Sequence, residues 1–129
     1  VGVKPIRLLA EKMDEHIVNC WLVNTGWVGE SAQSGAKRFS LPKTRNILSA
    51  ILNGSIEKSN FETDMYFGFE IPEQLDSLDS KTLNPLYAWK EIDKYHSSAQ
   101  MLVQKFQKNY KLYDLGDKNI LNAGPKIPK

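Results

Sequence analysis

One segment constrains the fold of this 129-residue chain more than any other: a β-type run, a loop of small residues, and a helix with clear ends. Residues 18–24 are rich in β-formers and apolar on both faces, which predicts a strand buried on both sides of a parallel or mixed sheet. Residues 25–40 hold three glycines and no aliphatic run, so we expect an irregular loop. Pro42 is suited to open the next helix, and Gly54 to end it with positive φ. A strand, loop and helix in this order can present backbone N–H groups to a nucleotide.

The remaining elements follow from hydrophobic spacing. Helical periodicity predicts helices over residues 5–16 and about 91–113, and the β-rich run 61–71 predicts further strand structure. We expect a polar surface connection over 73–85. Residues 1–115 then form one incomplete domain, and residues 116–129 form an extended tail.

Composition excludes some classes of function. The 17 cations against 15 anions give a net charge of +2, which is a balanced surface and not a nucleic-acid footprint. No apolar run approaches the length of a membrane span. The single cysteine cannot form an internal disulfide, which favours a reducing compartment and predicts a cytoplasmic protein. Because the chain opens on Val1 without a methionine, we expect a fragment.

Few residues suggest catalysis. The sequence has no phosphate loop ending in Gly-Lys-Ser/Thr and no pairs of cysteines at the spacing of a zinc site. His16 and His96 stand alone on predicted helices, which favours surface histidines over metal ligands. Cys20 falls inside the predicted strand, so we expect a buried, inert thiol.

The polar loop is the exception. Lys37 and Arg38 follow Gly35 and precede Thr44 and Arg45, an arrangement that could hold a planar base or a phosphate. Composition alone favours a plain solvated basic loop. Nucleic-acid binding is a third interpretation, weakened because the cations have no aromatic neighbour beyond Phe39.

Several ordered blocks resemble the C-terminal portion of ATP-dependent phosphoenolpyruvate carboxykinase. They are Leu22-Val23-Asn24-Thr25-Gly26-Trp27, Gly29, Gly35-x-Lys37-Arg38, Thr44-Arg45, Ala50-x-Leu52-Asn53-Gly54, Phe67-Gly68-Phe69-Glu70-Ile71-Pro72, Leu83-Asn84-Pro85 with Trp89, and Ala123-Gly124-Pro125-Lys126. The blocks run in register across nearly the whole chain. Two places depart from the family pattern: the loop 28–34 has fewer glycines, and Leu86 and Ala88 replace an arginine and a threonine.

The resemblance implies a mixed α/β fold, the C-terminal part of a nucleotide-binding domain with about three helices packed on a few strands of a mixed sheet. It implies a gluconeogenic carboxy-lyase that converts oxaloacetate and ATP to phosphoenolpyruvate, ADP and carbon dioxide. Arg38, Phe39 and Thr44 match the adenine side of the ATP site. The divalent metal, Mn or Mg, is held by residues upstream of this segment, so no residue here matches a catalytic or metal-binding position.

The partners implied are ATP, oxaloacetate and the missing N-terminal part of the same enzyme, with no nucleic acid and no membrane. The fragment alone is then expected to be inactive and to bind ATP very weakly. Two alternatives remain: a non-catalytic domain that binds a nucleotide or a protein partner, and an inactive homologue.

Overall fold

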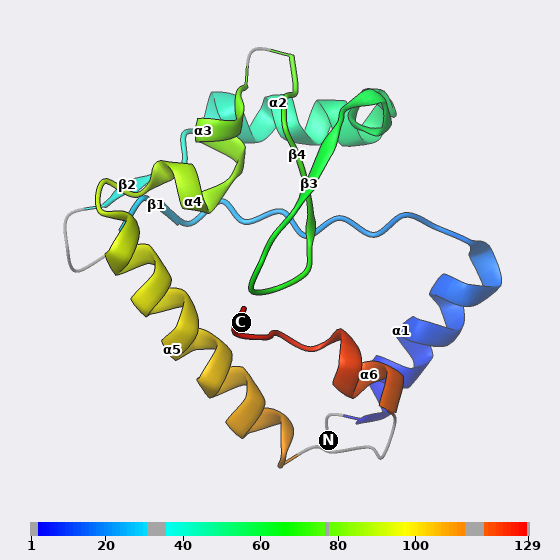
Figure 1. Ribbon diagram of the computed structural model, residues 1–129. Helices are drawn as coiled ribbons and strands as arrows, with labels where there is room; N and C mark the ends of the chain where they lie inside the picture. Colours follow the sequence, from blue (N-terminus) through cyan, green and yellow to red (C-terminus); the bar gives the residue numbers. More distant parts are fainter. Residues whose placement is uncertain (1–2, 31–35, 77, 113–117, 129) are drawn as a thin grey trace.

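A computed structural model describes residues 3–30, 36–76, 78–112 and 118–128 of the chain. It confirms the mixed α/β class, with two small antiparallel sheets in place of the expected mixed sheet. In Figure 1, α1 and α5 lie on opposite sides of the molecule, with α2 across one end and the β3–β4 hairpin drawn between them. The elements, in chain order, are α1 (Val3–His16), β1 (Trp27–Val28), β2 (Lys37–Arg38), α2 (Leu41–Leu52), the 3-10 helix η2 (Ser55–Lys58), β3 (Phe61–Thr63), β4 (Glu70–Pro72), α3 (Ser80–Leu83), α4 (Pro85–Ala88), α5 (Ile92–Tyr110) and α6 (Lys118–Ala123).

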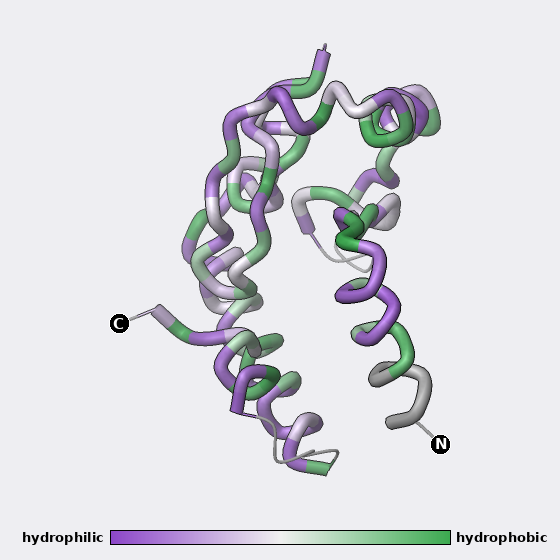
Figure 2. The backbone as a smooth tube through the Cα atoms, turned by 90° about the vertical axis from the view of Figure 1, so that its right-hand side faces the viewer, coloured by the Kyte–Doolittle hydropathy of each residue, from purple (hydrophilic) through white to green (hydrophobic). Residues whose placement is uncertain are grey.

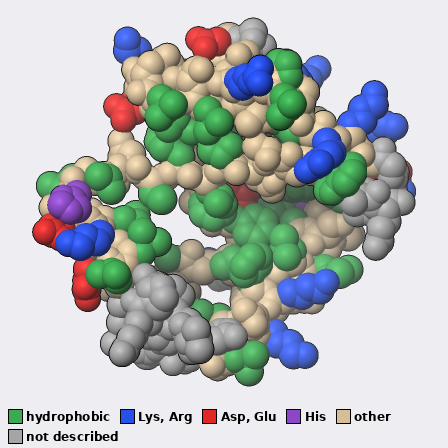
Figure 3. Space-filling model, turned by 180° about the vertical axis from the view of Figure 1, so that it is seen from behind, with side chains coloured by type: hydrophobic (Ala, Val, Ile, Leu, Met, Phe, Trp, Pro, Cys, Tyr) green, Lys and Arg blue, Asp and Glu red, His purple; other side chains and the backbone are tan. Residues whose placement is uncertain are grey.

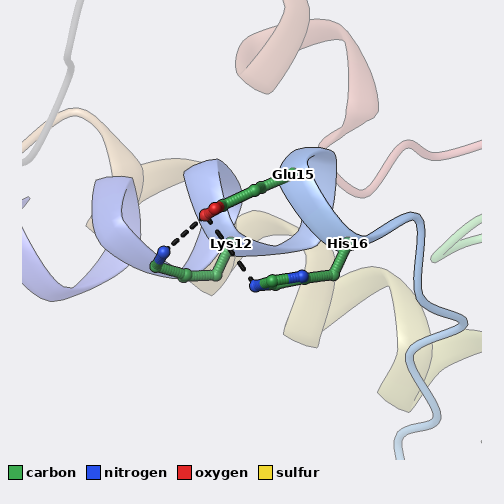
Figure 4. Close-up of polar contacts among 3 residues, drawn as sticks. All are labelled: Lys12, Glu15 and His16. Carbon is green, nitrogen blue, oxygen red and sulfur yellow. Dashed lines mark hydrogen bonds and ion pairs between the residues drawn. The ribbon is translucent and has the colours of Figure 1, made fainter.

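The first helix forms where the periodicity predicts it and ends in a cluster of polar side chains. Lys12 and His16 both face the Glu15 carboxylate, with His16 Nε2 3.8 Å from it (Figure 4). His16 is exposed, which confirms the prediction of a surface histidine. Ile17 then takes a φ of 48° and turns the chain out of the helix.

The predicted strand over 18–24 is wrong. These residues are extended, but neither of the two described sheets takes a strand from them. A strand buried on both faces needs neighbours to pair with, and Leu22 here is 80% exposed. Cys20 is exposed for the same reason, which corrects the prediction of a buried thiol.

A first core cluster packs α2 against the segment that follows β4. Ala50 and Ile56 meet Leu75 and Leu78, all of them buried. Trp21 packs against this cluster and stacks on Phe61 at 6.0 Å between ring centroids. The expected surface connection over 73–85 is therefore wrong: it supplies core residues and holds α3 and part of α4.

The β-rich region 61–71 folds back on itself as the hairpin β3–β4. Asp64 makes the turn: its Oδ1 accepts from the N–H groups of Tyr66, at 2.9 Å, and Phe67, at 2.6 Å. Gly68 completes the turn with a φ of 68°. A short polar residue and a glycine are the usual chemistry of such turns.

A second core cluster joins this hairpin to α5. Tyr66, Tyr95, Ala99 and Val103 are its buried members, and Leu86 packs against it. Leu86, one of the two departures from the family pattern, thus serves as a packing residue. Helix α5 confirms the predicted long helix from residue 92 to residue 110, while residue 113 lies outside the described residues.

His96 contacts the rings of Tyr66 and Tyr95, two members of the second cluster. Its Nδ1 lies 2.7 Å from the Tyr66 hydroxyl, and its ring is half-buried. The prediction of an isolated surface histidine is therefore wrong here. Helical periodicity gave no sign of the bond because Tyr66 arrives from the hairpin, 30 residues earlier in the chain.

The C-terminal segment is only partly extended. Its described residues begin with α6, which corrects the expected tail without helix. The chain then returns beside the hairpin, where the Lys126 N–H donates to the Tyr66 carbonyl at 2.8 Å. The side chain of Gln107 on α5 donates to the Pro125 carbonyl at 3.0 Å.

Large apolar side chains remain exposed on both flanks. Hydrophobic and hydrophilic residues alternate along α1 (Figure 2), and hydrophobic side chains gather on the back of the molecule around its open centre (Figure 3). We define the N-terminal apolar surface as Leu8, Leu9, Ile17, Val18 and Leu22, and the α5 apolar surface as Met101, Leu102 and Phe106, each at least 45% exposed. No helix in the described ranges has the length and apolar character needed to cross a membrane.

Candidate functional site

The polar loop is organised by the short hairpin β1–β2. Trp27 pairs with Arg38 in an antiparallel register. The turn into β1 is set by Asn24, whose Oδ1 accepts from the Gly26 N–H at 2.9 Å. The Phe39 N–H donates to the Gly26 carbonyl at 2.9 Å, which continues the pairing to the start of α2. Asn24 and Gly26 therefore shape the turn into β1.

Gly29 fixes this hairpin against another part of the chain. Its φ is +84°, and a Cβ atom there would lie 2.6 Å from the carbonyl oxygen of Ala88. Only glycine permits both this conformation and this approach. A second link joins α2 to α3, where Lys43 Nζ donates to Thr82 Oγ1 at 3.2 Å. The loop thus lies against α4, and α2 is bonded to α3.

Arg38 lies over an aromatic ring. Its guanidinium carbon is 5.8 Å from the centroid of the Trp27 indole, within the range of a cation–π interaction. Both side chains are exposed, so the pair faces solvent. Sequence reasoning considered only Phe39 as an aromatic neighbour and missed Trp27. The missing signal was the hairpin register, which places residues 27 and 38 opposite each other.

The next two candidate residues are close to Arg38 in the chain. Phe39 is half-buried between β2 and α2, and Thr44 is half-buried in the first turn of α2. The Thr44 hydroxyl donates to the Ser40 carbonyl at 3.2 Å, so its oxygen lone pairs stay free to accept a hydrogen bond. The structure therefore collects Arg38, Phe39 and Thr44 at the junction of the hairpin and α2. Gly35 lies outside the described residues.

A separate hollow of about 690 Å³ lies beside β3. Its lining includes Glu62, Glu73, Asp76 and Asp79, and none of its lining residues belongs to the hairpin β1–β2. The Tyr87 hydroxyl donates to the Glu62 carboxylate at 3.2 Å, and the same carboxylate raises the pKa of Tyr87. The lining holds four carboxylates against one cation, Lys58, so it is acidic and disfavours phosphate groups.

The described residues also bear on metal binding. Within the described ranges, no three His, Cys, Asp or Glu side chains come together in a way that could hold a metal ion. The junction of the hairpin and α2 therefore brings together a planar cation, a phenyl side chain and a hydroxyl oxygen, and the described residues offer no metal ligand set.

Comparison with known proteins identifies the family. The sequence profile of phosphoenolpyruvate carboxykinase matches residues 4–81, more than half of the chain. The chain is 43% identical over 132 residues to the phosphoenolpyruvate carboxykinase (ATP) of Candida glabrata, covering 98% of this chain and 24% of that protein. It is 45% identical over 112 residues to the protein of the same name from Leptospira biflexa, covering 87% of this chain and 21% of that protein. The chain thus spans about a quarter of the length of these curated relatives. It belongs to the phosphoenolpyruvate carboxykinase family.

Proposed function

We propose that this chain supplies the adenine side of the ATP site in an ATP-dependent phosphoenolpyruvate carboxykinase, with Arg38, Phe39 and Thr44 as the contact residues. The observation that carries the proposal is the position of Arg38, which lies over the Trp27 indole and is exposed. The relatives from Candida glabrata, Eremothecium gossypii and Novosphingobium aromaticivorans are each named phosphoenolpyruvate carboxykinase (ATP), which supports ATP as the nucleotide.

Each residue has a distinct part in binding the base. A planar guanidinium stacks on the face of the adenine ring, as it does on aromatic side chains. Phe39, half-buried, supplies apolar contact at the ring edge. The Thr44 oxygen has already donated its proton to Ser40, so it can accept one from the 6-amino group of adenine. These contacts bind and orient ATP and take no part in bond making.

The reaction itself belongs to the whole enzyme: oxaloacetate and ATP give phosphoenolpyruvate, ADP and carbon dioxide. When bound, a divalent metal, Mn or Mg, stabilises the enolate that decarboxylation leaves and the charge on the phosphoryl group in transfer. We place its ligands, and those of oxaloacetate, in the remaining three-quarters of the enzyme. The 129-residue chain alone is then inactive.

The same remaining part is the partner that covers the exposed apolar side chains. The N-terminal apolar surface and the α5 apolar surface each expose several large hydrophobic residues, and patches of this kind mark interfaces. Relatives about four times as long contain the chain that could cover them. The exposed thiol of Cys20 fits the reducing cytoplasm, where we place the enzyme.

A chimera tests the proposal. This chain replaces the matching quarter of the Candida glabrata enzyme, and steady-state kinetics are measured while ATP and oxaloacetate are varied separately. Arg38→Ala removes a stacking contact of about 1–2 kcal/mol, so we expect the KM for ATP to rise roughly fivefold to thirtyfold. The KM for oxaloacetate should stay nearly unchanged.

Arg45→Ala is the matched control. It removes the same charge from α2, next to Thr44, at an exposed position that we assign no contact with ATP. Its KM for ATP should stay within about twofold of that of the parent chimera, the scatter of a surface substitution. A chimera with no activity under either metal would refute the enzyme assignment, and equal effects of the two substitutions would refute the role of Arg38.

A further inference from the structure

We propose that Trp27 is a positioning residue for ATP binding: its indole holds the Arg38 guanidinium so that the cation lies between the indole and the adenine ring. This inference rests on the proposed function, since it assumes that Arg38 stacks on adenine. It assigns a role to a residue outside the set Arg38, Phe39 and Thr44.

The geometry of the hairpin brings the two side chains together. Trp27 and Arg38 are directly opposed in the antiparallel pairing of β1 and β2. Side chains opposed in this way emerge on the same face of a sheet and contact each other. The guanidinium carbon lies 5.8 Å from the indole centroid, within cation–π range, and both residues are exposed, so the cation is accessible to a ligand.

Other sources of orientation for Arg38 are missing from the described part of the chain. The ion pairs found there join residues of α1 or link Lys94 to Glu91, and none includes Arg38. A free arginine side chain holds about 2 kcal/mol of rotamer entropy that a ligand must overcome to order it. The indole lowers that cost by holding the guanidinium before ATP arrives.

Comparison of the three tryptophans shows that Trp27 is not a core packing residue. Trp21 packs against the first core cluster and Trp89 against the second. Trp27 belongs to neither cluster and is 52% exposed. Removing its ring therefore costs little folding energy and leaves the core intact, which makes a functional test practical.

A double-mutant cycle in the Candida glabrata chimera tests the inference. Four proteins are compared: the parent, Trp27→Leu, Arg38→Ala, and the double variant. The readout is the dissociation constant of a fluorescent ATP analogue labelled on the ribose, measured without oxaloacetate so that no turnover occurs. The KM for ATP and kcat are measured in parallel.

We expect Trp27→Leu to weaken binding of the analogue about threefold to tenfold, the range of one cation–π contact. It should raise the KM for ATP by the same factor and leave kcat and the KM for oxaloacetate unchanged. In the Arg38→Ala background the same substitution should have no further effect. Trp27→Phe should restore most of the affinity, because a phenyl ring also binds a guanidinium.

The outcomes separate the two claims. If Arg38→Ala weakens binding and Trp27→Leu does not, or if the two effects are additive, the positioning role is refuted and the proposed function stands. If Arg38→Ala itself leaves binding unchanged, the proposed function fails, and the positioning role fails with it. Should Trp27→Leu also lower the melting temperature of the chimera, the Arg38→Ala background decides the case: weaker binding there as well means a general folding defect and refutes the positioning role, whereas an effect confined to the Arg38 background supports it.

Discussion

Asn84 is the polar residue on which the packing of α4 depends most. Its side chain is buried, with 4% exposed. Its Oδ1 accepts from the Leu86 N–H at 2.9 Å and caps α4, while its Nδ2 donates to Glu62 Oε1 at 2.8 Å on β3. One side chain thus starts a helix and ties it to a strand 22 residues earlier.

Replacing Asn84 with alanine removes both bonds. Loss of the cap costs about 1 kcal/mol. Loss of a hydrogen bond to a charged carboxylate costs about 1.5–3 kcal/mol. Glu62 is only half-buried and keeps its bond from Tyr87, which places the second cost near its lower limit. We therefore expect a decrease of about 2–3 kcal/mol in the free energy of unfolding.

Urea unfolding of the 129-residue chain, followed by circular dichroism at low protein concentration, measures this decrease. Asp79→Ala is the matched control, because Asp79 caps α3 at an exposed position and makes no second bond of this kind. It should cost about 1 kcal/mol. Equal losses for Asn84→Ala and Asp79→Ala would refute the importance of the bond to Glu62.

Asn84→Asp separates the cap from the charge. The new carboxylate keeps the cap on α4 but lies against the Glu62 carboxylate, and two like charges raise the pKa of the folded pair above its unfolded value. The destabilisation is then full at neutral pH and is relieved as the pH falls and the pair takes up a proton. An Asn84→Asp variant whose loss of stability is the same at pH 4 and pH 7 would contradict this reasoning.

Three further expectations follow from single residues. Gly29→Ala should lower the free energy of unfolding by more than the roughly 1–2 kcal/mol that a left-handed residue costs, because its Cβ would meet a backbone carbonyl. Gly54→Ala, with a φ of +75° and open space around the new Cβ, should cost only that amount. The urea midpoints of the two variants test the difference. Burial and the Asp64 carboxylate raise the pKa of Tyr95 above its ordinary 10.0. The free energy of unfolding should therefore stay constant up to about pH 10 and decrease at higher pH. Unfolding curves at alkaline pH should show a smaller decrease for Tyr95→Phe. Cys20 is exposed, so a thiol reagent should modify it in the native chain without urea, whereas modification only after urea is added would show that the side chain is buried.

Local patterns predicted much of this fold. The helices α1, α2 and α5 form where apolar spacing and end signals place them, and Gly54 takes the positive φ expected at the end of α2. These elements depend on residues close together in the chain. The site candidates Arg38, Phe39 and Thr44, which sit within seven consecutive positions, came from the resemblance to the family and stay a prediction.

The predictions that were wrong concern features that depend on residues far apart in the chain. Residues 18–24 have the composition of a buried strand, yet pairing is not a property of one segment, and the described chain gives them no neighbour. In the sequence, Leu75 and Leu78 are isolated apolar residues in a polar stretch, and only the fold shows that they pack with Ala50. The contact of Trp27 with Arg38 was missed for the same reason, since the two residues lie on opposite strands of a hairpin that the composition of the loop does not indicate.

Photoaffinity labelling tests the central claim most directly. The chimera is irradiated with ATP that carries an azide on C8 of adenine, digested with chymotrypsin, and mapped by mass spectrometry. We expect the label within residues 36–45, the segment that holds Arg38, Phe39 and Thr44, and we expect excess ATP to suppress it. Label that excess ATP suppresses but that lies wholly outside this segment would contradict the assignment of the adenine site to this chain.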